Sequence, residues 1–361
     1  MGMIPNHGGL HAFIKTYQGV AREAEERVLS EVSNTAPIRS DVIDLAFAEA
    51  RKLISHGKKL RGALIVLGYD ITQGDPSLLQ LVLDVSVGYE FAHNAFLVHD
   101  DIMDRAPIRR NEQTTWKVFA EQIKGDDDHY GISQAINVGD MMGSWLPALI
   151  GRKEFGAAAI CSALRILRDI VHTTTLGQTL DINPGISLDQ LSYEYVDAIA
   201  RSKTALYTIA GPLQMGAALA GSPDHLDRHD AFAGFGIPIG VAFQYQDDVL
   251  GMYGSREELG KSVSSDLSEA KKTALFLEIH RRLDGPDRER FVKLWGGANI
   301  SESEVEWVRR MGRETGALET VQCRAREFVA TAETAIPRIS EEPHIQSLLR
   351  ELASFVVERT Y

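Results

Sequence analysis

Residues 78–104, LLQLVLDVSVGYEFAHNAFLVHDDIMD, decide what kind of fold this chain adopts. Apolar side chains recur there at three- and four-residue spacing, which predicts a long α-helix over 77–104. A membrane span needs about 20 consecutive apolar residues, whereas Asp84, Glu90 and His93 interrupt this stretch. We therefore expect a long internal helix and no stable insertion into a membrane.

The same periodicity predicts further helices over 41–56, 187–210 and 304–313. Strand-like alternation bounded by tight-turn pairs is scarce, which argues against a sheet-based fold. No internal repeat, low-complexity linker or break in composition divides the 361 residues. We therefore predict an all-α fold that forms a single domain over residues 1–361.

Short polar and proline-containing segments predict several helix boundaries. Asp75-Pro76 combines an N-capping carboxylate with proline at the first helical position. Asn183-Pro184-Gly185 predicts a turn, and Pro212 and Pro238 each predict a kink or a boundary in an apolar stretch. Asp126-Asp127-Asp128 has no apolar helix before it, so we expect a solvated loop there.

The bulk composition excludes several classes of protein. The net charge is −12, whereas nucleic-acid binders are usually basic, so we expect no nucleic-acid partner. The N-terminus lacks the basic and apolar regions of a signal peptide, which predicts a cytoplasmic location. Cys161 and Cys323 have the spacing of neither a disulfide framework nor a zinc site, and we expect two buried thiols.

The long apolar helix ends in a cluster of carboxylates. Asp100 and Asp104 are four residues apart, so both side chains project from one face of the helix. Like charges at this spacing repel each other, and a nearby cation would offset the repulsion. Ligands that offer only oxygen suit Mg²⁺, which keeps several waters and accepts phosphate oxygens. A second acidic segment, Gln244-Tyr245-Gln246-Asp247-Asp248, follows the apolar stretch 237–243.

Cationic residues accompany both acidic segments. Arg109-Arg110 follow the first segment closely, and Lys58-Lys59-Leu60-Arg61 precede it. Lys203, Lys261 and Lys271-Lys272 flank the second along the chain. Arginine forks bind phosphate oxygens in pairs and lysines act as mobile point charges. One acidic patch on a helix is usually a solvated face, but two patches with matched cations favour a phosphate site.

The order of these motifs resembles that of the trans-isoprenyl diphosphate synthase, or polyprenyl synthetase, family. The resemblance covers residues 53–273, roughly 60% of the chain. The family's DDxxD motif followed by RR is similar to residues 100–110, and its second aspartate-rich motif to residues 243–248. Further segments that occur in the family's order are His93, Gly177-Gln178-Thr179-Leu180-Asp181, Lys203-Thr204, Gly260-Lys261, Asp266-Leu267 and Lys271.

The resemblance implies a role for each matched residue. It implies Mg²⁺ ligands, for three ions per site, at Asp100, Asp104 and Asp247, with Asp101 and Asp248 as auxiliary or ligand-orienting groups. It implies contacts to the allylic diphosphate by Arg109, Lys203, Lys261 and Lys271. It implies binding of isopentenyl diphosphate by Lys58, Arg61, His93 and Arg110. It implies a reacting region lined by Gln178, Asp181, Thr204 and Gln244.

The implied enzyme is a prenyltransferase that joins isopentenyl diphosphate to an allylic diphosphate. Mg²⁺ would neutralise charge on the departing diphosphate, and no general base of the protein is required. The implied fold is a bundle of many helices around a central active-site cavity, assembled as a homodimer. Product length depends in the family on the positions five and four before Asp100, here Ala95 and Phe96. One open and one bulky position favour a C20 product over C15, with Tyr89 as the next bulky residue.

Three parts of the sequence depart from the family pattern. Gly251 stands where the second motif ends in aspartate, and we expect activity to survive because Asp247 is the main ligand. Residues 56–62, HGKKLRG, keep the cations of the family's GGKRxRP but lack one glycine and the proline. Asn111 replaces the glycine that follows the arginine pair.

Two other functions share part of this pattern. A class I terpene cyclase uses the same metal-triggered ionisation but needs no second diphosphate site. The cations at 58, 61, 93 and 110 and the lack of an NxxxSxxxE-like motif argue against a cyclase. A non-catalytic subunit of a heteromeric synthase typically loses charges from one motif, whereas both motifs here stay charged apart from Gly251.

Overall fold

Helices make up nearly all of the described structure. The computed structural model describes residues 9–123, 125, 127–221, 225–254, 265–297 and 299–358, with the backbone alone for 225–227 and 265. Within these ranges the only strands are β1 (Ile108–Arg109) and β2 (Glu112–Gln113), which form an antiparallel hairpin. The prediction of an all-α fold is confirmed. No helix in the described ranges combines the length and the apolarity that a bilayer crossing requires.

The chain divides into two compact units, and most of the boundaries between them fall inside helices. The first unit comprises Met1–Arg168, Gly211–Asp230 and Ile339–Leu348. The second comprises Asp169–Ala210, Ala231–Arg338 and Leu349–Tyr361. The helices that contribute residues to both units include α7 (Ala157–Asp181), α10 (His225–Tyr253) and α18 (Pro343–Glu358). That residues 1–361 form a single domain around a central cavity stays a prediction.

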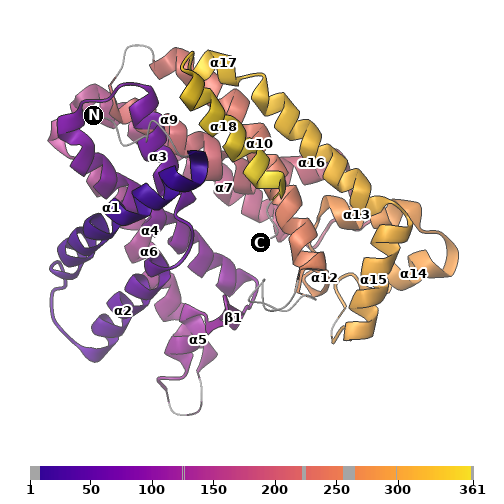
Figure 1. The fold of residues 1–361 in the computed structure, drawn as a ribbon. Coiled ribbons are helices and arrows are strands. Elements are labelled where there is room, and N and C mark those ends of the chain that lie inside the picture. The colour runs from indigo at the N-terminus through magenta and orange to yellow at the C-terminus, as the bar shows by residue number, and fades with distance from the viewer. Residues whose placement is uncertain are drawn as a thin grey trace. The chain divides into compact units, whose positions relative to one another are not determined.

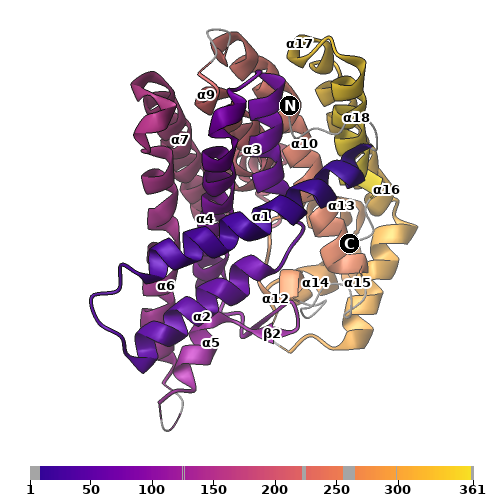
Figure 2. The ribbon, with the colours of Figure 1, turned by 60° about the vertical axis from the view of Figure 1, so that its left-hand side comes forward.

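The first unit is built around α4 (Leu79–Met103), the helix predicted over 77–104. Its neighbours are α1 (Gly9–Ser33), α2 (Asp41–Ser55), α3 (Leu60–Ile71), α5 (Thr115–Ala120) and α6 (Asp128–Ile150). Figure 1 shows these helices in indigo to magenta, and Figure 2 shows α1 lying across α4. The unit also contains η1 (Pro76–Leu78), η2 (Lys153–Phe155) and α9 (Gly211–Leu219), which packs against α3.

The burial of α4 explains why its sequence is apolar on all sides. Every residue from Val82 to Phe91 is buried, as expected for a helix that others surround. One of the two acids within this stretch, Asp84, accepts hydrogen bonds from Arg27 at 2.7 Å and from Arg152 at 2.5 Å. A buried charge is tolerated when it is paired in this way. α4 therefore forms a rigid centre from which its C-terminal carboxylates project.

The second unit packs its helices around α13 (Ala274–Arg282). The neighbours of α13 are α8 (Tyr193–Ile199), α14 (Gly285–Leu294), α15 (Glu302–Glu314) and α16 (Ala317–Glu333). An 11-residue π-helix, η3 (Ala200–Ala210), continues α8 without a break. The remaining described elements are α12 (Ser265–Ser268) and α17 (Ile336–Ile339).

Several predicted boundaries agree with the structure. The side chain of Asp75 accepts a hydrogen bond from Ser77 N at 2.8 Å, which caps the turn that leads into α4. Residues 183–185 lie between α7 and α8, and Pro212 is the second residue of α9. Pro238 neither begins nor ends a helix, since α10 continues through it.

Two other local predictions were wrong because a polar side chain caps a helix. The helix predicted over 187–210 begins only at Tyr193, since the Ser192 side chain accepts from Tyr195 N at 3.2 Å. Asp126-Asp127-Asp128 was expected in a loop, but Asp127 is the N-cap of α6 and accepts from Tyr130 N at 3.1 Å, and Asp128 is the first residue of this helix. Asp126 lies outside the described residues.

The cysteine prediction was also wrong. Cys161 and Cys323 are free thiols, but both are exposed. Spacing in the sequence excludes a cysteine framework, whereas burial depends on which helix face each thiol occupies.

Candidate active site

The first acidic segment closes α4 in the first unit. Asp100 lies in the last turn of α4, Asp104 is its C-cap residue, and both are half-buried. Asp104 N donates to Asp100 O at 2.8 Å, so helical hydrogen bonding continues between them. The two side chains therefore share one face of the helix, about one turn apart.

A tight hairpin follows this acidic segment. Arg109 of β1 pairs with Glu112 of β2, which leaves Arg110 and Asn111 as a two-residue turn with φ of 53° and 63°. Two left-handed central residues characterise the type I′ turn that two-residue hairpins favour, and asparagine tolerates this conformation. Asn111 therefore supports the turn although it replaces a glycine of the family pattern.

Arg109 of this hairpin binds two carboxylates of the acidic segment. Its Nε donates to Asp101 Oδ1 at 2.6 Å, and its Nη2 donates to Asp100 Oδ2 at 3.1 Å. Burial raises the pKa of Asp101 to about 6, against the opposing effect of the Arg109 charge. Burial alone would lower the pKa of Arg109, but the neighbouring carboxylates outweigh it and raise that pKa. The first acidic segment thus carries its own counter-charge.

Arg61, His93 and Arg110, called the cationic group after its two arginines, lie in the same unit, and the charges of both arginines act on His93. Arg61 lies in the first turn of α3, and His93 is buried in α4. Burial and the charges of Arg61, Arg110 and Arg109 lower the pKa of His93 well below its ordinary value, so the ring is neutral at pH 7. Burial, then Arg109 and Arg61, also lower the pKa of Arg110. Mutual repulsion of this kind, in a chain of net charge −12, indicates an anion site.

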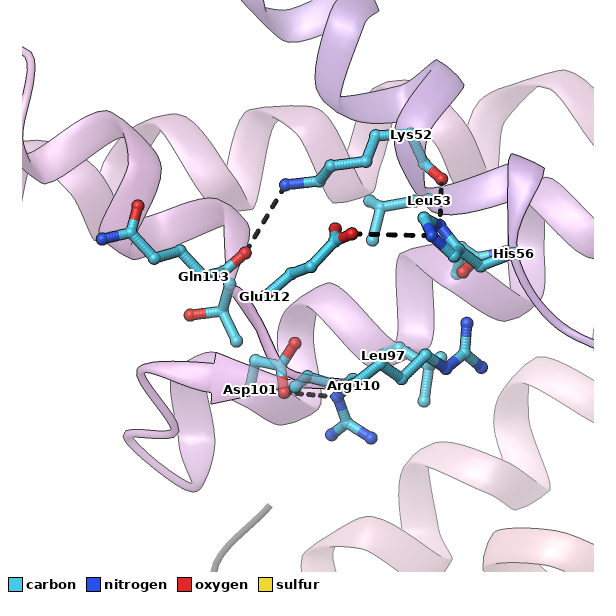
Figure 3. A pocket seen from close by; sticks show the side chains of 11 residues that line it. Lys52, Leu53, His56, Leu97, Asp101, Arg110, Glu112 and Gln113 are labelled. Carbon is cyan, nitrogen blue, oxygen red and sulfur yellow. Dashed lines mark hydrogen bonds and ion pairs between the residues drawn. The ribbon is translucent and has the colours of Figure 1, made fainter. Parts of the chain in front are cut away.

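An open pocket lies beside Arg110 (Figure 3). It is lined by Lys52, Leu53, His56, Asn94, Leu97, Asp101, Arg109, Arg110, Glu112, Gln113 and Thr114. Lys52 Nζ donates to Gln113 O at 3.5 Å, and His56 Nε2 lies 3.6 Å from Glu112 Oε1. A Cβ added at Gly57 would lie 3.8 Å from Arg110 Nη2. The exposed loop that carries Lys58 therefore begins next to Arg110.

The second acidic segment lies in α10 within the second unit. Thr204 of η3 donates to Gln244 Oε1 at 2.5 Å, and Gln244 Nε2 donates to Asp248 Oδ1 at 2.8 Å. Lys203 Nζ donates to Asp181 Oδ2 at 2.6 Å. Both Lys203 and Thr204 lie on the π-helix, a rare conformation that is frequent at functional sites. Five predicted residues are therefore joined in one hydrogen-bonded chain and one ion pair.

Negative charge crowds around Asp248. Its burial raises its pKa well above the ordinary value, and the hydrogen bond from Gln244 opposes this rise. The carboxylates of Asp266, Asp247 and Asp181 raise the pKa further. A cation bound among these groups would favour the ionised form of Asp248. Among the residues that the structure describes, the groups that shift the pKa of Asp248 include no equivalent of Arg109.

The space beside Gly251 is filled by a side chain from outside its own helix. The space that a Cβ at Gly251 would fill holds a carboxylate oxygen of Asp266. Asp266 is 5% exposed, and its Oδ1 lies 3.3 Å from Lys271 Nζ. Lys271 also pairs with Glu269 at 3.0 Å, so its partners in this structure include two acids. Lys261, which was predicted to contact the allylic diphosphate, lies outside the described residues.

Both acidic segments suit a metal ion that takes only some of its ligands from the protein. Among the residues that the structure describes, no three Asp, Glu, His or Cys side chains form a complete metal site. Each segment instead offers two carboxylates: Asp100 and Asp104 lie about one turn apart at the end of α4, and Asp247 and Asp248 are adjacent residues of α10. Mg²⁺ commonly takes one or two carboxylates and completes its coordination with water and substrate phosphates. The donor set therefore fits Mg²⁺ that arrives with a diphosphate.

The two positions predicted to set product length lie on α4. Ala95 is 5% exposed, and a Cβ added at Gly143 of α6 would lie 3.8 Å from its methyl group. Phe96 is half-buried. The small side chain thus faces a neighbouring helix, while the bulky one keeps partial access to solvent.

Two residues of the site were assigned no individual role from the sequence. Glu90 was noted only as an interruption of an apolar stretch, yet it is buried and accepts a hydrogen bond from Gly62 N at 2.9 Å. Its position three residues before His93 was the available signal. Lys272, the neighbour of the lysine that was singled out, donates to Asp181 O at 2.8 Å. No feature of the sequence distinguishes these adjacent lysines.

Known proteins are similar to this chain over most of its length. Residues 45–311 match the polyprenyl synthetase family. The chain is 30% identical, over 339 residues, to the short chain isoprenyl diphosphate synthase of Methanothermobacter thermautotrophicus, with 94% of this chain and 96% of that one covered.

Two solved structures are similar in fold and sequence. One is the geranylgeranyl pyrophosphate synthase of Corynebacterium glutamicum complexed with isoprenyl diphosphate and magnesium, at 29% identity and a TM-score of 0.86. The similarity covers 95% of this chain and 98% of that chain. The other is the polyprenyl synthase of Caulobacter crescentus complexed with calcium and isoprenyl diphosphate, at 25% identity and a TM-score of 0.80, covering 99% and 100%.

Proposed function

Since the chain belongs to the polyprenyl synthetase family and is a prenyltransferase, we propose that it joins isopentenyl diphosphate to allylic diphosphates in an Mg²⁺-dependent reaction. The observation that carries this proposal is the cationic group of Arg61, His93 and Arg110. Arg110 has like-charged neighbours, whereas Arg109 binds the carboxylates of the first acidic segment. A transferase needs one diphosphate site that depends on metal and one that does not.

The metal-independent site would bind isopentenyl diphosphate. Arg61 and Arg110 would bind its phosphate oxygens in pairs, and Lys58 would supply a mobile charge from the exposed loop. Because His93 is neutral at pH 7, it would contribute a ring N–H as a hydrogen-bond donor. Calorimetry without metal tests this site. Isopentenyl diphosphate should bind to the wild-type protein, and Arg110→Ala should weaken this binding.

The metal-dependent chemistry would use the two acidic segments. Asp100, Asp104 and Asp247 would hold Mg²⁺, three ions per site, with Asp101 and Asp248 as auxiliary groups. When bound with the allylic diphosphate, Mg²⁺ neutralises charge on the leaving group. Arg109, Lys203, Lys261 and Lys271 would contact the same diphosphate. Arg109 is already fixed in orientation by its bonds to Asp100 and Asp101.

The residues around Thr204 would stabilise the allylic cation. The Thr204 hydroxyl donates its hydrogen to Gln244, so its oxygen lone pairs can face developing positive charge. Gln178 and Asp181 would line the same region. Loss of a proton to the released diphosphate would then restore the double bond, and no side chain of the protein is needed as a base.

We propose a C20 product, with C15 as the next alternative. Ala95 leaves one of the two length-determining positions open, while Phe96 remains bulky. The similar structure from C. glutamicum is named a geranylgeranyl synthase, which supports the longer of the two products. Separation of the products by chain length tests this directly.

We also propose that the protein acts as a cytoplasmic homodimer. A C2 pair is the commonest oligomer of soluble proteins. Light scattering that shows only monomer across micromolar concentrations would contradict the dimer.

A further inference from the structure

The first turn of α3 carries Arg61 but has no cap of its own. Its N-cap residue, Lys59, adopts a left-handed conformation with φ of 54° and makes no side-chain capping bond. The first N–H groups of a helix have no partner within the helix, so they need acceptors from elsewhere. A non-glycine residue in this conformation also persists only where its surroundings hold it.

Two acids from other helices hold this turn. Glu25 of α1 forms an ion pair with Lys59 Nζ. Glu90 of α4 accepts a hydrogen bond from Gly62 N at 2.9 Å and is 8% exposed. A carboxylate at a helix N-terminus is favourable for the helix dipole as well as for the N–H group. Glu90 therefore serves as the cap that α3 does not provide.

The residue at position 62 suits this arrangement. Gly62 replaces the proline of the family's GGKRxRP, and a proline would have no N–H to donate to Glu90. The hydroxyl of Tyr17 occupies the space where a Cβ at position 62 would lie, and this hydroxyl is 2.9 Å from Ser86 Oγ. The glycine thus allows both the hydrogen bond that its N–H donates to Glu90 and the close approach of α1.

Glu90 also connects two residues of the cationic group. Gly62 is adjacent in sequence to Arg61, and His93 lies three residues after Glu90, on neighbouring turns of α4. The positive charge of Arg61 opposes the rise that burial imposes on the pKa of Glu90. The buried carboxylate therefore faces the turn of α3 from the same helix segment that carries His93.

We propose that Glu90 is a positioning residue for isopentenyl diphosphate: it caps α3 through Gly62 N and so fixes the turn that carries Arg61. This inference rests on the proposed function, because it takes Arg61 and His93 as ligands of that substrate. Glu90 itself touches no reacting atom.

The test compares variants of two buried acids on α4. Glu90→Ala and Glu90→Leu remove the acceptor, Glu90→Gln keeps an acceptor oxygen, and Asp84→Ala removes an acid bound to Arg27 and Arg152. Calorimetry measures isopentenyl diphosphate binding without metal, steady-state kinetics give KM for each substrate, and thermal unfolding reports stability. Two variants without the acceptor are made, so that the comparison can still be carried out if one of them fails to fold.

Loss of the acceptor should weaken isopentenyl diphosphate binding about tenfold or more, since small misplacements of binding groups can cost about 100-fold. KM for the allylic diphosphate should stay within about twofold in the same variants. Glu90→Gln should retain affinity within about threefold, and Asp84→Ala should lower the unfolding temperature without this loss of affinity.

Two results would overturn the inference while leaving the function intact. One is wild-type affinity for isopentenyl diphosphate in folded Glu90→Ala or Glu90→Leu. The other is an equal loss of affinity in Asp84→Ala, because the effect would then reflect general packing of α4. A wild-type protein that does not bind isopentenyl diphosphate at all would instead overturn the substrate assignment and, with it, the role of Glu90.

Discussion

The two acidic segments look alike in sequence, but their electrostatic surroundings differ. At the end of α4, Arg109 donates to Asp101 at 2.6 Å and to Asp100 at 3.1 Å. On α10, Asp248 accepts a hydrogen bond from the neutral Gln244, while three further carboxylates raise its pKa. The first segment is thus balanced by the protein itself. Among the described residues, the neighbours that shift the pKa of Asp248 supply no such counter-charge, so a bound cation would supply it.

The largest effect is expected from removing a metal ligand from either segment. Asp100→Ala and Asp247→Ala should each reduce turnover about 1,000-fold, equivalent to ~4 kcal/mol of transition-state stabilisation. The helical circular dichroism should not change, because both side chains are half-buried at helix surfaces. Near-wild-type turnover in Asp100→Ala would remove the first segment from the mechanism.

In the metal-free protein, substitutions in the two acidic segments should change the free energy of unfolding in opposite directions. Asp248→Asn should stabilise the metal-free protein at pH 8, because it removes one of several charges that repel each other. The gain should be only about 1 kcal/mol, since solvent partly screens this half-buried side chain. Arg109→Gln should destabilise it by about 1–3 kcal/mol, since two hydrogen bonds to charged groups are lost. Thermal unfolding with and without Mg²⁺ measures both.

Addition of Mg²⁺ provides the control for this pair. The advantage of Asp248→Asn should disappear when Mg²⁺ and a diphosphate are present, because the wild-type carboxylates then have their counter-ion. If both substitutions destabilise the metal-free protein equally, the contrast between the segments is not electrostatic.

Product length should depend on the helix that carries the first segment. Phe96→Ala should shift the products to longer chains, because it removes the bulky member of the length-determining pair. Leu97→Ala is the matched control, since Leu97 is the next residue on α4 and lines the pocket beside Arg110. An unchanged length distribution in Phe96→Ala would mean that Phe96 only packs against its neighbours.

The smallest effect on activity is expected at Gly251. Gly251→Asp restores the family's residue but meets the carboxylate of Asp266, which must shift. Turnover should change by no more than about fivefold, while stability should fall by roughly 1–2 kcal/mol, as for other overpacked sites. A second substitution, Asp266→Ala, should recover much of that stability. Full stability in Gly251→Asp alone would show that Asp266 moves without cost.

Much of the fold could be predicted because its signals are local. The apolar periodicity of 77–104 and the cap at Asp75 predicted α4, and the all-α class followed from similar periodicity elsewhere. The start of α8 was missed because Ser192 ends an irregular turn that has helical composition. Exposure of Cys161 could not be predicted, since it depends on packing between distant segments.

The site was predictable where its residues belong to motifs, and not where distant segments meet. Thr204 and Gln244 were both identified as candidates, and the structure shows the 2.5 Å hydrogen bond between them. Glu90 and Gly62 are 28 residues apart, and no local pattern connects them. The entry of Asp266 into the space at Gly251 is likewise visible only in three dimensions.

The central claim is that the protein condenses isopentenyl diphosphate with an allylic diphosphate and needs Mg²⁺ to do so. The most direct test incubates the purified protein with labelled isopentenyl diphosphate and each allylic primer, with Mg²⁺ or with excess chelator, and separates the products by length. We predict linear prenyl diphosphates, with C20 dominant, in the Mg²⁺ reactions alone. Cyclic hydrocarbon products, or no condensation with any primer in the presence of Mg²⁺, would contradict the account.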